Sequence, residues 1–160
     1  MRHRVIDSPL GELTLVVTDD DALAALYIAA QKYHPGDETL GERDDHVAQD
    51  AVDQLRDYFA GTRTSFDLPL DPQGTDFQRR VWAALRDIDY GATETYGHLA
   101  ERIGSPRGTR AVGAATGRNP ISIVIPCHRL VGASGDLTGY AGGLPRKRWL
   151  LDFESGEVLV

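Results

Sequence analysis

A cysteine, a histidine and an arginine stand side by side at Cys127-His128-Arg129, directly after Pro126. A thiol is a strong nucleophile only as the thiolate, and a neighbouring imidazole or positive charge lowers its pKa. These residue types therefore indicate nucleophilic chemistry at Cys127. Adjacent side chains in an extended segment point in opposite directions, however, and a lone cysteine also serves as a small buried apolar residue. The tripeptide alone leaves both interpretations open.

Apolar residues precede this tripeptide and glycines follow it. The run Ile123-Val124-Ile125 predicts a buried strand that ends at the cysteine. Glycines at 132–143 predict a loop whose backbone amides can approach a ligand closely. Their spacing matches neither a Walker motif nor a dinucleotide fingerprint. We therefore expect a ligand-binding loop of another kind beside Cys127.

Composition limits the other kinds of site that this 160-residue chain can build. The single cysteine excludes an internal disulfide and a multi-cysteine zinc site, and the five histidines show no ligand spacing. No long apolar region follows the basic residues at the N-terminus, and no run approaches the roughly 18 apolar residues of a membrane span. We expect a cytoplasmic protein with no metal site and one domain or two small ones.

The net charge of −7 is distributed unevenly. Residues 1–76 contain 6 Lys+Arg and 16 Asp+Glu, whereas residues 77–160 contain 11 and 8. Between Arg102 and Arg148 there are eight basic residues and a single acid, Asp136. This asymmetry favours an acidic scaffold joined to a basic surface that binds nucleic acid. The alternative is a basic face that acidic neighbours balance in space.

The first half predicts a small sheet followed by a helix. The predicted strands cover residues 3–7, 11–19, 22–30 and 64–70. Residues 31–44 are polar and predict a loop. Apolar residues at helical spacing predict a helix over 45–60 that Gly61 ends. The whole chain is therefore expected to be α/β (α+β), with the sheet near the N-terminus.

A linker at 71–74 separates two expected domains, 1–72 and 73–160. The second is expected to be mostly helical. Its first helix is capped by Thr75 or Asp76 and ends at Tyr90-Gly91. The buried side of that helix carries Phe77, Val81, Trp82, Leu85 and Ile88.

Two further helices predict a helix-turn-helix. Thr95 caps the first, over 96–103, and a tight link at 105–108 leads to the second, which runs through Thr116. Many helix pairs share this pattern. A last helix is expected over 144–154, with Trp149, Leu150, Leu151 and Phe153 toward the core.

The second helix of this pair carries almost no side-chain bulk. In Thr109-Arg110-Ala111-Val112-Gly113-Ala114-Ala115-Thr116-Gly117, Arg110 is the one long side chain. A helix that reads bases in the major groove needs polar side chains that reach base edges. This helix instead suits close approach to a DNA backbone or a shallow minor groove. The alternative is tight packing against another helix of the same protein.

Taken together, these motifs resemble the O6-alkylguanine-DNA alkyltransferases, which repair DNA by direct reversal of damage. The resemblance covers essentially the whole second half, and the first half matches in layout only. Its motifs are Phe77-Gln78-Arg79-Arg80-Val81-Trp82, Tyr96-Gly97, Arg110-Ala111-Val112-Gly113, Asn119-Pro120, Ile125-Pro126-Cys127-His128-Arg129, Gly139-Tyr140-Ala141-Gly142-Gly143-Leu144 and Glu154. Pro-Cys-His-Arg is the most specific of them.

The resemblance implies a catalytic role for each of five residues. Cys127 would attack the alkyl carbon on O6 of guanine (and O4 of thymine is a further possible site) and keep the alkyl group. His128 would take the thiol proton through a water, and Glu154 would orient the imidazole. Tyr96 would donate a proton or hydrogen bond to N3 of the leaving guanine. Asn119 would tie the recognition helix to the active-site turn.

The resemblance also implies how DNA is held. Arg110 would fill the gap left by the extruded nucleotide, with further contacts from the same helix. These contacts would come from Thr109, Ala111, Gly113, Ala114 and Arg118. The guanine pocket would include Leu130, Tyr140 and Ala141, and backbone groups near Cys127, Leu130 and Ala141 would read the guanine edge. Many relatives have valine in place of Leu130, and the contact there is through the backbone carbonyl.

The partner implied is double-stranded DNA that contains O6-alkylguanine, bound in the minor groove with little sequence specificity. The target base must be flipped out of the stack. No cofactor is needed, because the protein itself accepts the alkyl group and acts once. We expect a monomer, and cooperative binding of copies along DNA is left open.

Two other functions compete with this one. A non-catalytic lesion sensor of the same fold would lack the cysteine, which this chain has. A cysteine hydrolase would need an oxyanion hole, and a dithiol redox protein would need a second cysteine.

Overall fold

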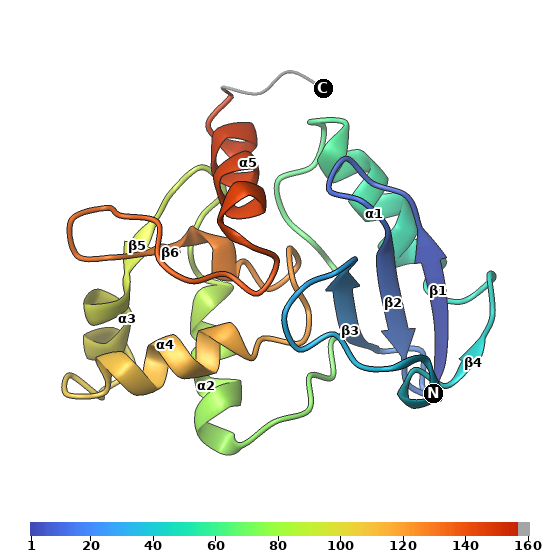
Figure 1. Ribbon diagram of the computed structural model, residues 1–160, viewed down its shortest axis with the longest axis horizontal. Coiled ribbons are helices and arrows are strands. Elements are labelled where there is room, and N and C mark those ends of the chain that lie inside the picture. The colour runs from blue at the N-terminus through green and yellow to red at the C-terminus, as the bar shows by residue number, and fades with distance from the viewer. Residues whose placement is uncertain (157–160) are drawn as a thin grey trace. The chain divides into compact units, whose positions relative to one another are not determined.

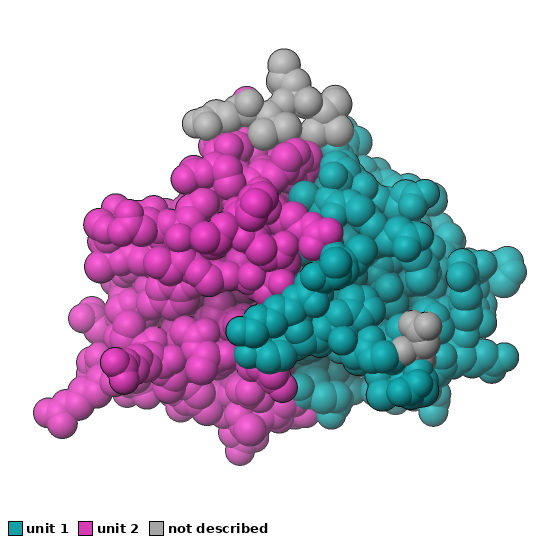
Figure 2. Space-filling view, in the orientation of Figure 1, with its two compact units in different colours: residues 1–73, 120–122, 160 teal, residues 74–119, 123–159 magenta. Residues whose placement is uncertain are grey.

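The computed structural model describes residues 1–156, except for the side chain of Asp37. Backbone contacts divide the chain into two compact units (Figure 2). Among the described residues, unit 1 comprises 1–73 and 120–122, and unit 2 comprises 74–119 and 123–156. The last four residues of the second expected domain, 157–160, lie outside the described part of the chain.

Unit 1 is built on a four-stranded sheet in the order β3-β2-β1-β4 (Figure 1). Its strands are β1 (Arg2–Ile6), β2 (Leu13–Val17), β3 (Leu23–Ile28) and β4 (Glu42–Arg43). The first three are antiparallel neighbours, and β4 runs parallel to β1. Every residue of β2 is buried, including the polar Thr14. The three predicted strands at the N-terminus are therefore confirmed.

The helix of unit 1, α1 (Gln49–Phe59), begins four residues later than predicted. Asp44 accepts a hydrogen bond from the backbone N–H of His46, and Ala48 has a φ of 58°. A left-handed residue cannot continue a right-handed helix, so the chain turns here before α1 begins. The segment predicted as an irregular loop, 31–44, also differs, because it contains η1 (Asp37–Thr39) and β4.

The prediction of a strand at residues 64–70 was wrong. The segment makes one isolated bridge, between Leu70 and Leu23 of β3. The carbonyl of Pro69 accepts from Leu23 N, and Asp71 N donates to the carbonyl of Leu23. Pro69 has no N–H with which to extend the ladder, so pairing stops there.

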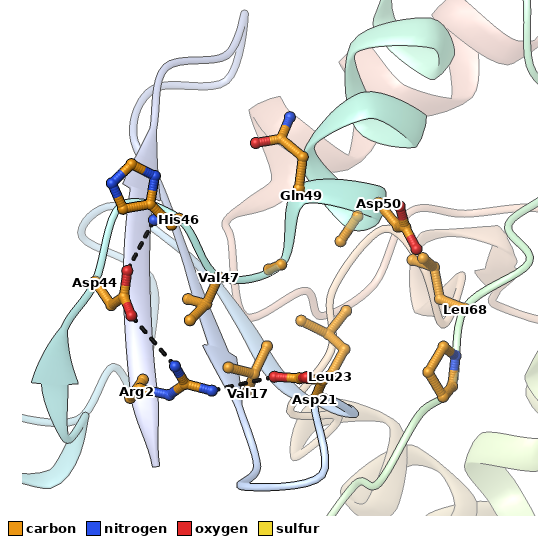
Figure 3. A pocket seen from close by; sticks show the side chains of 13 residues that line it. Arg2, Val17, Asp21, Leu23, Asp44, His46, Val47, Gln49, Asp50 and Leu68 are labelled. Atoms are coloured by element: carbon orange, nitrogen blue, oxygen red, sulfur yellow. Dashed lines mark hydrogen bonds and ion pairs between the residues drawn. The ribbon is translucent and has the colours of Figure 1, made fainter.

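A cavity of about 390 Å³ lies between the sheet of unit 1 and the beginning of α1 (Figure 3). Arg2 spans its wall, with 3.1 Å from Nη2 to Asp21 Oδ1 and 3.2 Å from Nη1 to Asp44 Oδ2. The two carboxylates satisfy the one arginine that lines the cavity. None of the site residues predicted from the sequence lies in its wall.

Unit 2 is mostly helical. Its regular elements are α2 (Asp76–Leu85), β5 (Glu94–Thr95), α3 (Tyr96–Arg102), α4 (Thr109–Gly117), η2 (Cys127–Arg129), β6 (Leu130–Val131) and α5 (Leu144–Glu154). A parallel pairing of β5 with β6, which the sequence did not predict, joins the start of α3 to the end of η2. None of the helices within residues 1–156 is long and apolar enough to cross a membrane.

The first helix of unit 2 begins as predicted and ends earlier. Thr75 caps α2 through a reciprocal pair of bonds with Gln78, a capping box. The helix ends at Leu85 rather than at Tyr90, and the carbonyl of Leu85 accepts from Ile88 N in a tighter turn. Ile88 is nevertheless buried, so the apolar pattern predicted burial correctly and helix length incorrectly.

The helix-turn-helix is formed by α3 and α4. Thr95 caps α3 by accepting from the backbone N–H of His98, as predicted. Trp82 of α2 is buried, and its Nε1 donates to the carbonyl of Ala115 at 2.8 Å. This bond and the contacts of α3 hold α4 by its inner face.

The prediction that a buried strand ends at Cys127 was wrong. Residues 122–126 form turns and irregular backbone, and Cys127 begins the short 3₁₀-helix η2. Ile123 has a φ of 74°, which interrupts an extended conformation and is unusual for a β-branched residue. The apolar run is buried as predicted, but it is a folded loop and not part of a sheet.

Candidate active site

Cys127 lies at the start of η2 and is buried, with 5% of its surface exposed. Its backbone N–H donates to the carbonyl of Ile125 at 2.8 Å. The side chain of Asn119 donates to the same carbonyl at 2.9 Å and also hydrogen-bonds the cysteine. Asn119 directly follows Arg118, the C-cap of α4. Its side chain thus joins the end of α4 to the turn that carries the thiol.

Burial is the largest influence on the thiol of Cys127, and it raises the pKa. The hydrogen bond from Asn119 and the positive charge of Lys147 act in the opposite direction. The thiol therefore holds its proton until a base takes it, and the groups around it favour the thiolate once it forms.

His128 and Glu154 meet inside unit 2. The distance from His128 Nε2 to Glu154 Oε2 is 2.8 Å, and both side chains are almost completely buried. An ionised carboxylate only accepts hydrogen bonds, so Nε2 carries the proton and Nδ1 is left with a free lone pair. Nδ1 is buried and has no hydrogen-bond partner among residues 1–156. Burial lowers the pKa of His128, which favours the neutral imidazole that a base requires.

Arg129 completes this cluster, and the sequence indicated it only as a neighbouring charge. Its Nε and Nη2 donate to the two oxygens of Glu154 at 2.8 and 3.0 Å, and Nη1 donates to the carbonyl of Ile88 at 2.6 Å. Burial alone would raise the pKa of Glu154, but bonds and charge from His128 and Arg129 hold it at about 2. Glu154 is therefore ionised and fixed from two sides.

Tyr96, at the start of α3, faces the glycine-rich loop. Its hydroxyl donates to the carbonyl of Thr138 at 3.0 Å. Burial raises the pKa of Tyr96, so the phenol keeps its proton at neutral pH. The structure thus brings this predicted residue to the loop that carries Tyr140 and Ala141, both half-buried.

Lys147 was missed as a site residue by reasoning from sequence. It is completely buried in α5, and its Nζ donates to the carbonyls of Leu130, Thr138 and Gly139. One signal could have found it: Lys147 lies at helical spacing from Leu150 and Glu154, on the face that α5 buries. Leu130 itself is fully buried on β6.

The residues predicted to bind DNA lie along the outer face of α4. Most of them are exposed, and Gly113 is partly exposed. The exposed members are Thr109, Arg110, Ala111, Ala114 and Arg118, of which Arg118 caps the helix. The opposite face is buried through Val112, Ala115 and Thr116. These residues therefore lie on the side of α4 that faces away from its buried face.

Within residues 1–156, no group of three or more His, Cys, Asp or Glu side chains is arranged to hold a metal ion. The chemistry of the cluster is that of a buried thiol, an imidazole and a carboxylate.

Two family models match this chain and together cover nearly all of it. The DNA-binding domain of 6-O-methylguanine DNA methyltransferase matches residues 76–156. The ribonuclease-like domain of 6-O-methylguanine DNA methyltransferase matches residues 1–72.

Individual relatives agree with these models. The methylated-DNA–protein-cysteine methyltransferase of Mycobacterium tuberculosis is 52% identical over 158 residues, 99% of this chain and 94% of the relative. The protein of the same name from Methanosarcina acetivorans is 43% identical over 154 residues, 96% and 98% of the two chains. A crystal structure of Mycobacterium tuberculosis OGT in complex with DNA superposes with a TM-score of 0.93 at 51% identity, covering 98% of this chain and 94% of the other.

Proposed function

This chain belongs to the 6-O-methylguanine DNA methyltransferase family, and from that premise we propose that Cys127 is the residue that accepts the alkyl group. The protein repairs DNA by transfer of an alkyl group to itself, as a methylated-DNA–protein-cysteine methyltransferase. The single observation that carries the residue assignment is the buried cluster in which the sequence neighbour of Cys127, His128, is bonded to Glu154.

In the proposed reaction, the proton of the Cys127 thiol passes through a water to His128 Nδ1. The positive charge that forms on the imidazole is stabilised by Glu154, which remains ionised. The sulfur attacks the alkyl carbon on O6 of guanine, so that a sulfur–carbon bond forms while the carbon–oxygen bond breaks. The electron pair of the broken bond stays on guanine, and Tyr96 donates a proton or hydrogen bond at N3 so that the base leaves neutral.

The product explains why the protein acts once. A thioether at Cys127 is not reversed by any group in the cluster, and the described residues contain no other thiol to accept the alkyl group. No cofactor enters the scheme, because the protein supplies both the nucleophile and the base. The guanine pocket is proposed to include Leu130, Tyr140 and Ala141, with backbone groups near Cys127, Leu130 and Ala141 reading the guanine edge.

The proposed DNA surface is the outer face of α4. Its small residues had two interpretations, close approach to DNA or tight packing within the protein. A methyl group placed on Gly113 would lie 3.9 Å from the Tyr96 ring, an ordinary contact, and one on Gly117 would meet nothing within 4 Å. Packing within unit 2 therefore does not demand glycine at these positions, which favours close approach of an outside surface.

Such a helix suits the minor groove with little sequence specificity, since it offers no side chains that read base edges. Arg110 is proposed to enter the stack that the flipped base vacates. The rest of the proposal follows the expectations from sequence: a monomer in the cytoplasm, with residues 1–72 as a supporting domain and 73–160 as the domain that binds DNA and transfers the alkyl group. Cooperative binding of several copies, which the sequence left open, is measured by titrating a DNA duplex with the protein.

The test is incubation with duplex DNA that carries O6-[methyl-³H]guanine. We expect one label per protein molecule, on Cys127, and no label on Cys127→Ser, which should still bind DNA because the sulfur contacts no phosphate. Release of label with repeated turnover would instead indicate a hydrolase. Binding without any transfer would indicate a lesion sensor, and transfer by Cys127→Ser at the rate of the unchanged protein would exclude Cys127 as the acceptor.

A further inference from the structure

Lys147 is completely buried in α5, yet no carboxylate among the described residues bonds to its ammonium. Its Nζ lies 2.6 Å from the carbonyl oxygen of Leu130, 2.9 Å from that of Thr138 and 3.3 Å from that of Gly139. An ammonium has three N–H donors, so the three carbonyls use its full donor capacity. A buried charge without a counter-ion is costly, and such a group normally has a function that retains it.

The three carbonyls belong to the segments that surround the proposed guanine pocket. Leu130 directly follows η2, and Thr138 and Gly139 directly precede Tyr140 and Ala141 in the glycine-rich loop. Glycine-rich loops have many accessible conformations, so a fixed loop needs ties of this kind. Lys147 provides such a restraint, because its Nζ hydrogen-bonds both the glycine-rich loop and β6 while its backbone is part of α5.

Tyr96 shares this arrangement. Its hydroxyl and Lys147 Nζ both donate to the carbonyl of Thr138. The ammonium also lies 5.8 Å from the centre of the Tyr96 ring, within the range of a cation–π contact. The position of the phenol that is proposed to protonate the leaving base is therefore linked to that of Lys147.

The charge of Lys147 also acts on the reacting group. Burial lowers the pKa of Lys147 to about 8, while interaction with Cys127 acts to raise it. In return the ammonium lowers the pKa of Cys127, and it also lowers that of His128. The titratable groups coupled to Lys147 are thus Cys127, His128 and, through its ring, Tyr96. A thiolate at Cys127 would supply the negative charge that Lys147 otherwise lacks.

We propose that Lys147 is a positioning residue for alkyl transfer: its ammonium holds the carbonyls of Leu130, Thr138 and Gly139 around the guanine pocket, and its charge supports the thiolate of Cys127. The inference rests on the proposed function for its substrate. The effect on the thiol needs no DNA and can be measured separately.

The chain offers a matched control, because Lys32 and Lys147 are its two lysines and Lys32 is exposed. Lys147→Met keeps the length of the side chain and removes the charge and all three donors, and Lys32→Met makes the same change at the surface. The first measurement is the rate at which iodoacetamide alkylates the protein between pH 5 and pH 10. Since Cys127 is the single cysteine, the rate reports on it alone.

We expect Lys147→Met to move the pH profile of this reaction to higher pH by about one unit, whereas Lys32→Met leaves it unchanged. Transfer from O6-methylguanine in duplex DNA should fall by at least about tenfold in Lys147→Met alone. Lys147→Arg keeps the charge but not the shape of the side chain. Its pH profile should therefore be closer to that of the unchanged protein than its transfer rate is. Slower transfer with an unmoved iodoacetamide profile would refute the effect of the Lys147 charge on Cys127, and an unchanged transfer rate in Lys147→Met would refute its positioning of the pocket.

If Lys147→Met fails to fold, the unchanged protein provides the second measurement. With ¹⁵N-labelled lysine, the side-chain nitrogens of Lys32 and Lys147 are titrated by NMR before and after iodoacetamide has blocked Cys127. We expect the pKa of Lys147 to fall when the thiolate can no longer form, and that of Lys32 to stay constant. An unchanged titration of Lys147 would refute the coupling. Failure of the unchanged protein to transfer a methyl group would contradict the proposed function instead, and both DNA-free measurements would still decide the role of Lys147.

Discussion

At the scale of single residues, Glu154 connects the parts of the proposed active site. One carboxylate accepts from His128 and forms a two-pronged pair with Arg129, while burial keeps water from competing. Bidentate pairs of this kind fix orientation as well as charge. The imidazole is therefore held in one tautomer, with Nδ1 as its basic atom.

The same contacts make the stability of the protein depend on Glu154 and on pH. The pKa of Glu154 is held at about 2, below its ordinary value of 4.5. A carboxyl with a lowered pKa stabilises the folded state fully above its unfolded pKa, and this contribution is lost as pH falls from about 4.5 toward 2. The shift corresponds to about 3 kcal/mol. His128 adds to acid sensitivity, because its lowered pKa means that the unfolded chain binds protons more readily below pH 6.5.

We predict that Glu154→Gln is less stable than the unchanged protein by about 3–5 kcal/mol at pH 7, because it leaves Arg129 without its buried partner. The difference should shrink as pH falls from 4.5, since the unchanged protein then loses the contribution of the carboxylate. Urea unfolding at a series of pH values measures this. A constant difference between pH 7 and pH 3 would show that the ionised state of Glu154 does not support the fold.

At the scale of elements, α4 combines a buried inner face with an outer face of small residues. Glycine inside a helix is destabilising by about 1 kcal/mol relative to alanine. Gly113 is retained even though the space around it would accept a methyl group. That is the expected compromise when a helix must approach a surface that is absent from the protein itself.

Gly113→Ala separates folding from binding on this helix. We predict an increase in the free energy of unfolding of up to about 1 kcal/mol, together with weaker binding to duplex DNA. Urea unfolding and fluorescence anisotropy with a labelled duplex measure the two effects. Unchanged or tighter DNA binding by the stabilised variant would mean that α4 does not approach DNA closely.

Arg110→Ala tests the proposed insertion into the base stack. Its loss should slow repair of O6-methylguanine in duplex far more than in single-stranded DNA or as the free base, because only the duplex must be unstacked. The measurement is the second-order transfer rate for the three substrates. Arg56→Ala, an exposed arginine of α1 in unit 1, is the matched control. Equal fractional losses for all three substrates would leave Arg110 as a phosphate contact or a structural residue.

At the scale of the whole molecule, basic residues gather in the second half of an acidic chain. A net charge of −7 opposes general attraction to DNA, so binding must come from a local surface. The turn and the outer face of the helix-turn-helix contribute exposed Arg107, Arg110 and Arg118. We therefore expect the contact with DNA to be limited to this part of the protein.

Affinity for undamaged duplex should therefore fall steeply with salt. If each of the three arginines neutralises one phosphate, they alone give a slope of about −3 in a plot of log K against log salt concentration. Arg110→Ala should reduce the slope by about one, and Arg56→Ala should leave it unchanged. Titrations with several unrelated duplex sequences should differ little from one another. A flat plot would mean that this basic surface does not bind DNA.

Local patterns in the sequence were sufficient to predict most of the helices and strands. The sequence predicted α3 and α5 with accurate bounds, and Thr75 and Thr95 cap α2 and α3 as expected. These features depend on residues within one or two turns of each other, which is why a single sequence contains them. The motif around Cys127 likewise placed the chain in its family.

The tertiary structure decided what depends on residues far apart in the chain. The run Ile123-Val124-Ile125 is apolar enough for a strand, yet it folds as a loop because its backbone turns at Ile123, which has a positive φ. Lys147 reads as one of three basic residues at the start of a helix, and only its contacts with carbonyls 8, 9 and 17 residues away reveal that it is buried. Arg129 reaches Glu154 across 25 residues. Burial and long-range hydrogen bonds are properties of the folded chain. Residue types and spacing therefore predicted a nucleophilic cysteine, and the fold determined which charged groups surround its thiol.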